Sequence, residues 1–181
     1  MFKKTLLVST LATLIFSATA NANGTQGSGL VHFKGTVINA PCGIDPDSVE
    51  QTVDFGQISQ SYLNNGNKTS PVKFNIKLVN CEPAALTNGV KVNFTGGTYA
   101  DKTQLATTGQ ATNSAIKISS QSNGSIVEFG KDIYTEPQEL IDGNNTLEFS
   151  AWVEQALING AAATVDVGSF SATTNFNLAY D

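Results

Sequence analysis

The chain has 181 residues, enough for one ordinary domain, and 40% of them are hydrophobic. Its formal net charge is −5, because 15 Asp and Glu outweigh 10 basic side chains, all of them Lys. Such an acidic chain lacks the basic surface that binds a phosphate backbone, so nucleic acid is excluded as an expected partner.

The first 22 residues have the pattern of a secretory signal peptide. Lys3 and Lys4 precede the apolar residues 6–16, and the small-residue triplet 20–22 follows. This apolar run is shorter than the roughly 20 residues that span a bilayer. We expect cleavage before Asn23, with cleavage two residues earlier as the alternative. The mature chain is then soluble without a transmembrane segment, and its formal charge is 8 minus 15, or −7.

Residues 23–40 form an extension ahead of the first cysteine. The segment 23–29 contains three glycines among polar residues, a composition typical of a flexible arm. The segment 31–37 then alternates strictly. Its apolar parity consists of Val31, Phe33, Gly35 and Val37, while His32, Lys34 and Thr36 have the opposite parity. This pattern predicts a β-strand that has no partner in its own domain.

Residues 41–181 repeat an all-β pattern of short alternating runs separated by Gly, Asn, Asp or Pro. The apolar positions that predict strands are Val49, Val53 and Phe55; Val72, Phe74, Ile76 and Leu78; Val90, Val92 and Phe94; Ile116 and Ile118; and Leu147, Phe149, Ala151 and Val153. About seven strands with this spacing favour a two-sheet sandwich of the immunoglobulin type.

The last strand has the cleanest alternation in the chain and ends at the carboxyl terminus. Its apolar row is Phe170, Ala172, Thr174, Phe176, Leu178 and Tyr180. No later strand follows to pair with it, so its edge is expected to stay open and to accept another strand. Burying an apolar arm residue there would contribute roughly 1.5 to 3 kcal/mol per side chain. Because donor and acceptor surfaces differ, repeating the contact produces an open filament.

Cys42 and Cys81 are the two cysteines of the chain. Export to an oxidising compartment favours a disulfide between them, and their spacing excludes a CxxC redox motif. A crosslink that closes a loop of about 40 residues stabilises a fold by roughly 4 kcal/mol on the chain-entropy model. We expect a structural bridge.

Several of these features together resemble the major pilins of chaperone–usher fimbriae, closest to the type 1 pilin. Residues 31–37, leading into Ala40-Pro41-Cys42, resemble the donor segment and first cysteine of that family, with Gly35 at its glycine position. Asn80-Cys81 is similar to the second cysteine. Tyr180 is penultimate and Gly168 is fourteenth from the end, as in these pilins.

The resemblance implies an incomplete immunoglobulin-like sandwich that lacks its final strand and is completed by donor-strand exchange. Residues 1–22 would be the signal peptide, 23–40 the donor-strand extension and 41–181 the pilin domain. Val31, Phe33, Gly35 and Val37 would be donor residues. The acceptor groove, which also pairs with the chaperone and usher, would comprise Gly168, Phe170, Ala172, Thr174, Phe176, Leu178 and Tyr180.

The implied partners are identical or related subunits, a periplasmic chaperone and an outer-membrane usher. The implied location is a fimbria on the bacterial surface, reached through the periplasm, and the assembled fimbria would offer a surface to host glycans. Neither a cofactor nor a metal nor catalysis is implied. A minor adaptor pilin and a stand-alone secreted carbohydrate-binding sandwich remain as alternatives, while a hydrolase lacks a recognisable nucleophile–base pair.

Three side-chain features have an ordinary reading beside a functional one. His32 is expected to be a solvent-facing arm residue. The loosely clustered carboxylates Asp45, Asp47, Glu50 and Asp54 match no EF-hand spacing, so a solvated surface is favoured over a cation site. Trp152 has the parity opposite to the apolar row of its strand, which leaves both a surface aromatic that contacts sugar or a neighbour and a side chain covered by packing.

Overall fold

The computed structural model describes residues 27–181, so the expected signal peptide and its cleavage point lie outside the described residues. The chain divides into two units at residue 36, and the second of them, residues 37–181, is compact. In the first unit, residues 27–36 form neither helix nor strand, and their side chains are exposed. Within the described residues, no helix is both long and apolar enough to cross a membrane.

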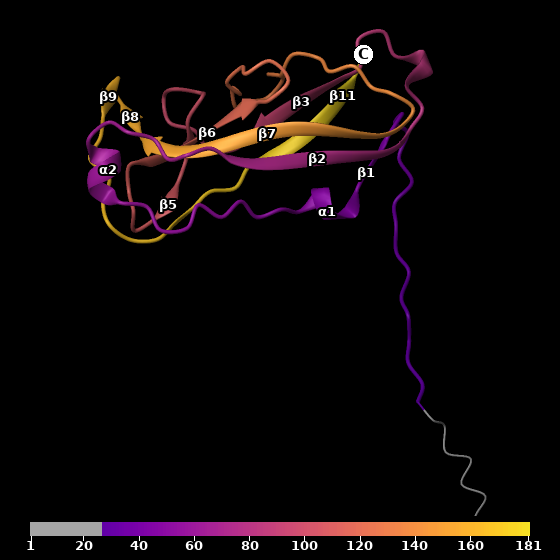
Figure 1. Cartoon of the computed structure of the whole chain (residues 1–181), viewed down its shortest axis with the longest axis horizontal. Coiled ribbons are helices and arrows are strands. Elements are labelled where there is room, and N and C mark those ends of the chain that lie inside the picture. Colours follow the sequence, from indigo (N-terminus) through magenta and orange to yellow (C-terminus); the bar gives the residue numbers. More distant parts are fainter. Residues whose placement is uncertain (1–26) are drawn as a thin grey trace, which may run out of the picture. The chain divides into compact units, whose positions relative to one another are not determined.

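The second unit is built from β-strands with a few short helices (Figure 1). The larger strands are β2 (Val72–Cys81), β3 (Val90–Thr95), β6 (Ser114–Ser120), β7 (Gly143–Gln155) and β11 (Asn175–Tyr180). The two-residue strands are β1 (Gly43–Ile44), β4 (Leu105–Ala106), β5 (Thr108–Gly109), β8 (Leu157–Ile158), β9 (Ala161–Ala162) and β10 (Phe170–Ser171). The helices are α1 (Pro46–Val49), α2 (Gln60–Asn64) and the 3-10 turn η1 (Pro83–Ala85).

One layer of the domain is a five-stranded sheet in the order β1-β2-β7-β6-β4. Its central strand β7 pairs antiparallel with β2 and with β6, and Phe74 lies opposite Phe149 in the first of these registers. The inward side chains Leu147, Phe149 and Val153 are at most 2% exposed. The alternation of apolar residues therefore buries one face of this sheet, as a period of two requires.

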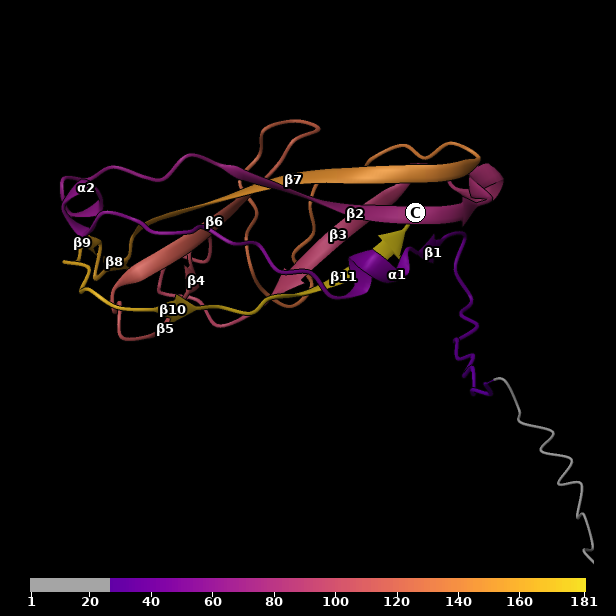
Figure 2. The same ribbon diagram turned by 60° about the horizontal axis from the view of Figure 1, so that its bottom comes forward.

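The facing layer consists of two strand pairs, β11 with β3 and β10 with β5. Figure 2 shows β2 and β7 along one side of the domain and β3, β11 and β10 on the other. The two layers meet where Phe94 of β3 packs edge-to-face against Phe149 of β7, with ring centroids 5.2 Å apart. The core lies between these layers, as the predicted immunoglobulin-like sandwich requires.

The strands predicted around Val72–Leu78, Val90–Phe94, Ile116–Ile118 and Leu147–Val153 are all present as β2, β3, β6 and β7. The strand predicted at residues 49–55 is wrong. Residues 51–59 carry no assigned structure, because their main chain pairs with no neighbouring strand among the described residues. The predicted last strand is interrupted, since residues 172–174 separate β10 from β11.

Candidate functional site: an apolar groove beside the last strand

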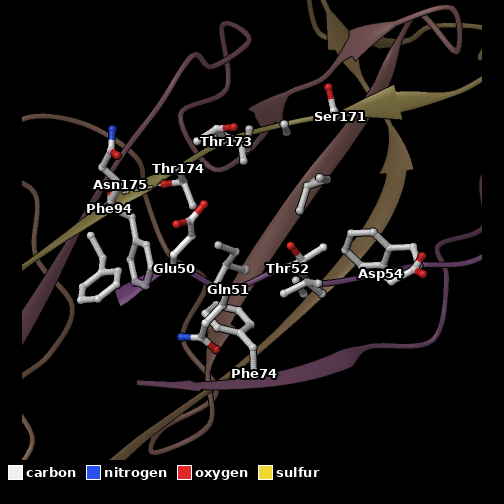
Figure 3. Close-up of a pocket in the computed structure, with 18 of the residues that line it drawn as sticks. Glu50, Gln51, Thr52, Asp54, Phe74, Phe94, Ser171, Thr173, Thr174 and Asn175 are labelled. Atoms are coloured by element: carbon white, nitrogen blue, oxygen red, sulfur yellow. Dashed lines mark hydrogen bonds between the residues drawn. The ribbon is translucent and has the colours of Figure 1, made fainter. Parts of the chain in front are cut away.

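A long groove of about 920 Å³ runs along the domain between two chain segments. We call residues 48–56 the first wall and residues 168–176 the second wall. Figure 3 shows these segments on opposite sides of the groove, with Glu50 and Thr52 on the first and Ser171 and Thr173 on the second. The groove therefore lies directly beside the carboxyl-terminal segment, where the sequence predicted an open edge.

The floor of the groove is the hydrophobic core itself. Side chains from both layers line it, namely Phe74, Ile76, Phe94, Leu105, Ile116, Ile118 and Ala151. Except for Phe74, these side chains are at most 8% exposed, so they are packed against one another below the opening. An apolar side chain that enters the groove from above would extend this core and not meet water.

Most of the first wall and the middle of the second wall have no main-chain partner. Among residues 27–181, positions 50–58 and 172–174 take part in no main-chain hydrogen bond to another segment. Main-chain N–H and C=O groups that lie at the edge of a core are strongly driven to find partners. Residues 50–56 of the first wall and 172–174 of the second thus offer unpaired backbone on both sides of an apolar floor, which is the environment that an added strand satisfies.

Side-chain contacts hold these unpaired stretches in place. The Gln51 amide donates to the carbonyl of Asn75 on β2 over 2.9 Å, and the Thr174 hydroxyl donates to the carbonyl of Thr95 on β3 over 3.1 Å. At one end of the groove, the rings of Phe55 and Phe170 approach across the opening, with centroids 6.4 Å apart. The groove is open along its length and narrowed by this aromatic pair.

The predicted acceptor residues divide into two sets. Gly168, Phe170, Ala172, Thr174 and Phe176 line the groove. Leu178 and Tyr180 lie further along β11, opposite Val92 and Val90 of β3. They pack against the core but do not line the groove. The Tyr180 hydroxyl is buried without a hydrogen-bond partner among the described residues, and this burial raises its pKa above the ordinary value of 10.0.

Gly168 has a structural reason to be glycine that is independent of any partner. Its φ of +138° lies in the region that disfavours side chains, and a Cβ atom there would lie 2.4 Å from Cβ of Gln110. Gly109, which pairs with Phe170, has the same constraint, because its Cβ would lie 2.4 Å from the Ser169 carbonyl oxygen. Both glycines let the second wall approach β5 closely.

The predicted donor side chains are almost fully exposed. Val31 is 75% exposed, Phe33 92% and Val37 101%, which is unusual for three large apolar residues so close together. A Cβ added at Gly35 would meet no atom within 4 Å. Nothing in this chain alone therefore requires glycine at position 35, so its role in an acceptor groove stays a prediction.

The predicted disulfide between Cys42 and Cys81 is present, and both residues are 2% exposed. The bridge joins the residue that precedes β1 to the last residue of β2. Beside it, Glu82 N–H donates to the carbonyl of Pro41 over 2.9 Å. The start of the domain is thereby fixed to the central sheet.

The structure shows the surroundings of the other side chains that the sequence singled out. Within residues 27–181, no group of three or more His, Cys, Asp or Glu is arranged to hold a metal ion. Trp152 is only 6% exposed, donates its indole N–H to Glu154 and lies beneath the Lys68 ammonium, 4.5 Å from the ring centroid. It is covered by packing and presents no aromatic surface to a sugar. His32 is exposed, as expected.

The sequence interpretation missed the first wall. Val49, Val53 and Phe55 were predicted to form a core strand, but Val49 is 64% exposed, and Phe55 packs on the core from the groove side. The only available signal was Phe55 among polar residues, and apolar alternation alone does not distinguish a core strand from the wall of a groove.

Comparison with known proteins agrees with this architecture. Residues 31–181 match the family model described as "Fimbrial protein". The chain is 40% identical to KS71A fimbrillin of Escherichia coli over 179 residues, which cover 94% of each protein. It is also 40% identical to the Fimbria A protein of Serratia marcescens over 176 residues, which cover 97% of each.

Solved structures give the same result. A subunit from the structure of a chaperone–usher pilus is 38% identical, with a TM-score of 0.77, and the match covers 86% of this chain and 97% of that one. The crystal structure of the P pilus rod subunit PapA is 37% identical, with a TM-score of 0.70, covering 78% and 100%. The chain therefore belongs to the fimbrial protein family, and it is a structural subunit of a surface pilus and not an enzyme.

Proposed function

We propose that this subunit polymerises by donor-strand exchange, in which the arm of one copy (residues 30–38) fills the groove between the two walls of another copy. The single observation that carries the proposal is the match between an exposed apolar row on the arm and an apolar groove whose walls include stretches of unpaired backbone. Each surface is unfavourable in water by itself, and each supplies what the other lacks.

The two surfaces agree in length. Val31 to Val37 covers six residue steps, about 20 Å for an extended strand. The groove-lining row of the second wall, Phe170 to Phe176, also covers six steps. Burial of Val31, Phe33 and Val37 would contribute roughly 1.5 to 3 kcal/mol each. Main-chain hydrogen bonds to both walls would add to this.

The same groove gives a reason for chaperone and usher partners. A subunit whose core is open along this length exposes apolar surface before it is assembled, and such a surface aggregates unless it is covered. A periplasmic chaperone would cover the groove with a strand of its own, and an outer-membrane usher would then present it to the next arm. On this view the mature domain spans residues 41–181, and the extension spans residues 23–40.

The test compares two substitutions at adjacent arm positions in the full mature chain. Phe33→Ser removes a side chain expected to enter the groove, whereas Lys34→Ser changes the opposite face and serves as the matched control. A loss of roughly 1.5 to 3 kcal/mol weakens the joint about 10-fold to 150-fold. We expect detergent-resistant ladders from the Lys34 variant and few or none from the Phe33 variant.

Mixing the proteins gives a second readout. The Phe33→Ser subunit keeps its groove, so it accepts an arm but donates poorly. Small amounts added to the wild-type protein should therefore shorten the polymers by terminating one end. Equal ladders from both variants would show that the Phe33 side chain does not enter the groove, and a stable monomer that never polymerises would instead favour a stand-alone carbohydrate-binding sandwich.

A further inference from the structure

Three exposed apolar side chains lie at one end of the domain and have no role in the groove. They are Tyr62, 50% exposed, Ile158, 41% exposed, and Val167, 71% exposed, and we call them the end patch. Their segments are α2, the β8–β9 hairpin and the loop that precedes Gly168. Both views show α2, β8 and β9 together at the end of the domain away from the carboxyl terminus (Figures 1 and 2).

Hydrogen bonds fix these three segments to one another. The Asn64 side chain donates to the Val165 carbonyl over 3.2 Å and accepts from the Val165 N–H over 2.8 Å. The Gln155 amide donates to the Ala163 carbonyl over 2.9 Å, which ties the hairpin return to the end of β7. The end patch is therefore a preformed surface, and it borders the groove where the second wall begins at Gly168.

At the opposite end of the domain, the chain enters the fold after its arm. Cys42 is bonded to Cys81 there, and the main-chain N–H groups of Thr87 and Asn88 donate to the carbonyl of Asp181. If the inserted arm ran parallel to β11, the domain of the copy that donates it would lie at this same end. It would then meet the residues of the acceptor that connect to the acceptor's own arm. A donor antiparallel to β11, like every paired strand of the fold, brings it to the end patch.

The linker between donor strand and domain is short. From Val37 to Cys42 there are five peptide steps, which reach at most about 18 Å when fully extended. Pro41 restricts the chain further. A domain on so short a tether is held at the mouth of the groove at a high effective concentration, so a small apolar contact is enough to keep it in place.

We infer that the end patch is a docking surface for the domain of the next copy of this chain, namely for its η1 turn and the adjoining Pro41 region. This inference rests on the proposed donor-strand exchange and adds a second, domain-to-domain contact. In η1, Ala84 and Ala85 are exposed, and Glu82 N–H donates to the Pro41 carbonyl, which holds this turn beside the linker. Apolar side chains on both partners make the contact complementary.

The test uses a photo-crosslinking amino acid, p-benzoylphenylalanine, at position 167 of the full mature chain. Polymers are assembled from equal amounts of isotopically light and heavy subunits, irradiated, reduced and digested with trypsin. We expect mixed-isotope crosslinks to the peptide of residues 78–91, which contains η1. Ile141, 69% exposed, is the matched control position and should give no such crosslink.

A second measurement uses the Ile158→Ser/Val167→Ser variant, with Ile141→Ser as control. We expect its detergent-resistant ladder to persist, since arm and groove are unchanged, while electron micrographs show a loss of fibre persistence length. An intact wild-type ladder without the 78–91 crosslink would overturn the inference and leave the proposed function standing. Absence of any ladder from the wild-type chain would overturn both.

Discussion

Two strands of this domain have the same sequence pattern and reach different states. In β7 the apolar row is at most 3% exposed from Leu147 to Val153, because β2 and β6 pair with it on both sides. In β11 the corresponding side chains are only partly buried, because β3 is the single strand paired with it within residues 27–181. Burial in a sheet is thus set by the number of neighbouring strands as well as by alternation.

The comparison also explains why the groove forms where it does. On the β7 side, main-chain groups are hydrogen-bonded to a strand on each side, and the side chains pack against one another. We call this the closed side of the domain and the groove side the open side. On the other side, the first wall and residues 172–174 have no ladder, and the gap between them exposes the core. One missing strand accounts both for the unpaired backbone and for the apolar opening.

The largest expected effect comes from the closed side. Phe149→Ala removes a side chain that is 0% exposed and contacts both Phe74 and Phe94. We expect a loss of about 3 to 5 kcal/mol in the free energy of unfolding. Denaturant unfolding measures it, with and without an added peptide of residues 23–40. A loss that disappears when the peptide is added would contradict the distinction between closed and open sides.

Removal of the disulfide should be nearly as costly. The Cys42→Ala/Cys81→Ala variant frees a loop of 39 residues, which costs about 4 kcal/mol on the chain-entropy model. The bridge fastens the beginning of the domain to β2, so the loss should be similar with and without the arm peptide. Chemical denaturation of the variant and of reduced wild-type protein provides the measurement. Unchanged stability in both would show that the crosslink constrains little.

Sequence periodicity predicted the closed side well and the open side incompletely. Strands β2, β3, β6 and β7 follow directly from alternation, because each has a neighbour that accepts its main-chain groups. Residues 49–55 show a similar apolar spacing without forming a strand, since no neighbour is available. Alternation reports which way side chains point, whereas strand formation also requires a partner that a single sequence does not specify.

The candidate site shows the same division. The predicted residues from Phe170 to Phe176 lie along the groove, but Ser171, Thr173 and Asn175 of the opposite parity lie there too, so the acceptor role of the predicted row stays a prediction. The burial of Trp152 could not be predicted in this way. Trp152 has outward parity, but Lys68 and Glu154 cover its ring. Lys68 belongs to a loop far away in sequence, and Glu154 belongs to the same strand as Trp152. Tertiary cover of this kind is not encoded in local periodicity.

A smaller but more diagnostic effect is expected on the open side. Phe176 is half-buried, so Phe176→Ala should cost the empty subunit about 2 kcal/mol, near half the value for a fully buried ring. With the arm peptide bound, the cost should grow, because the peptide completes the burial of this ring. Unfolding and peptide titration measure both values. Asn177→Ala, on the outward face of β11, is the matched control and should change neither.

The smallest effect concerns the Tyr180 hydroxyl, which is buried without a partner on the open side. Because burial raises its pKa in the folded state, its contribution to stability is complete below the ordinary pKa of 10.0 and is lost as pH rises through the folded pKa. Tyr180→Phe removes an unpaired hydroxyl, so near pH 7 its stability should equal that of wild type within about 1 kcal/mol.

Above about pH 10 the Tyr180→Phe variant should lose less stability than wild type, since phenylalanine has no proton to release. Denaturant unfolding over this alkaline range measures the difference, and Tyr62→Phe, at a 50% exposed position, is the matched control substitution. A wild-type-minus-variant difference that stays flat with pH would show that the hydroxyl is solvated. If the arm peptide extends along β11 as far as Tyr180, the same difference should shift to higher pH when the peptide is bound, because added burial raises the pKa further.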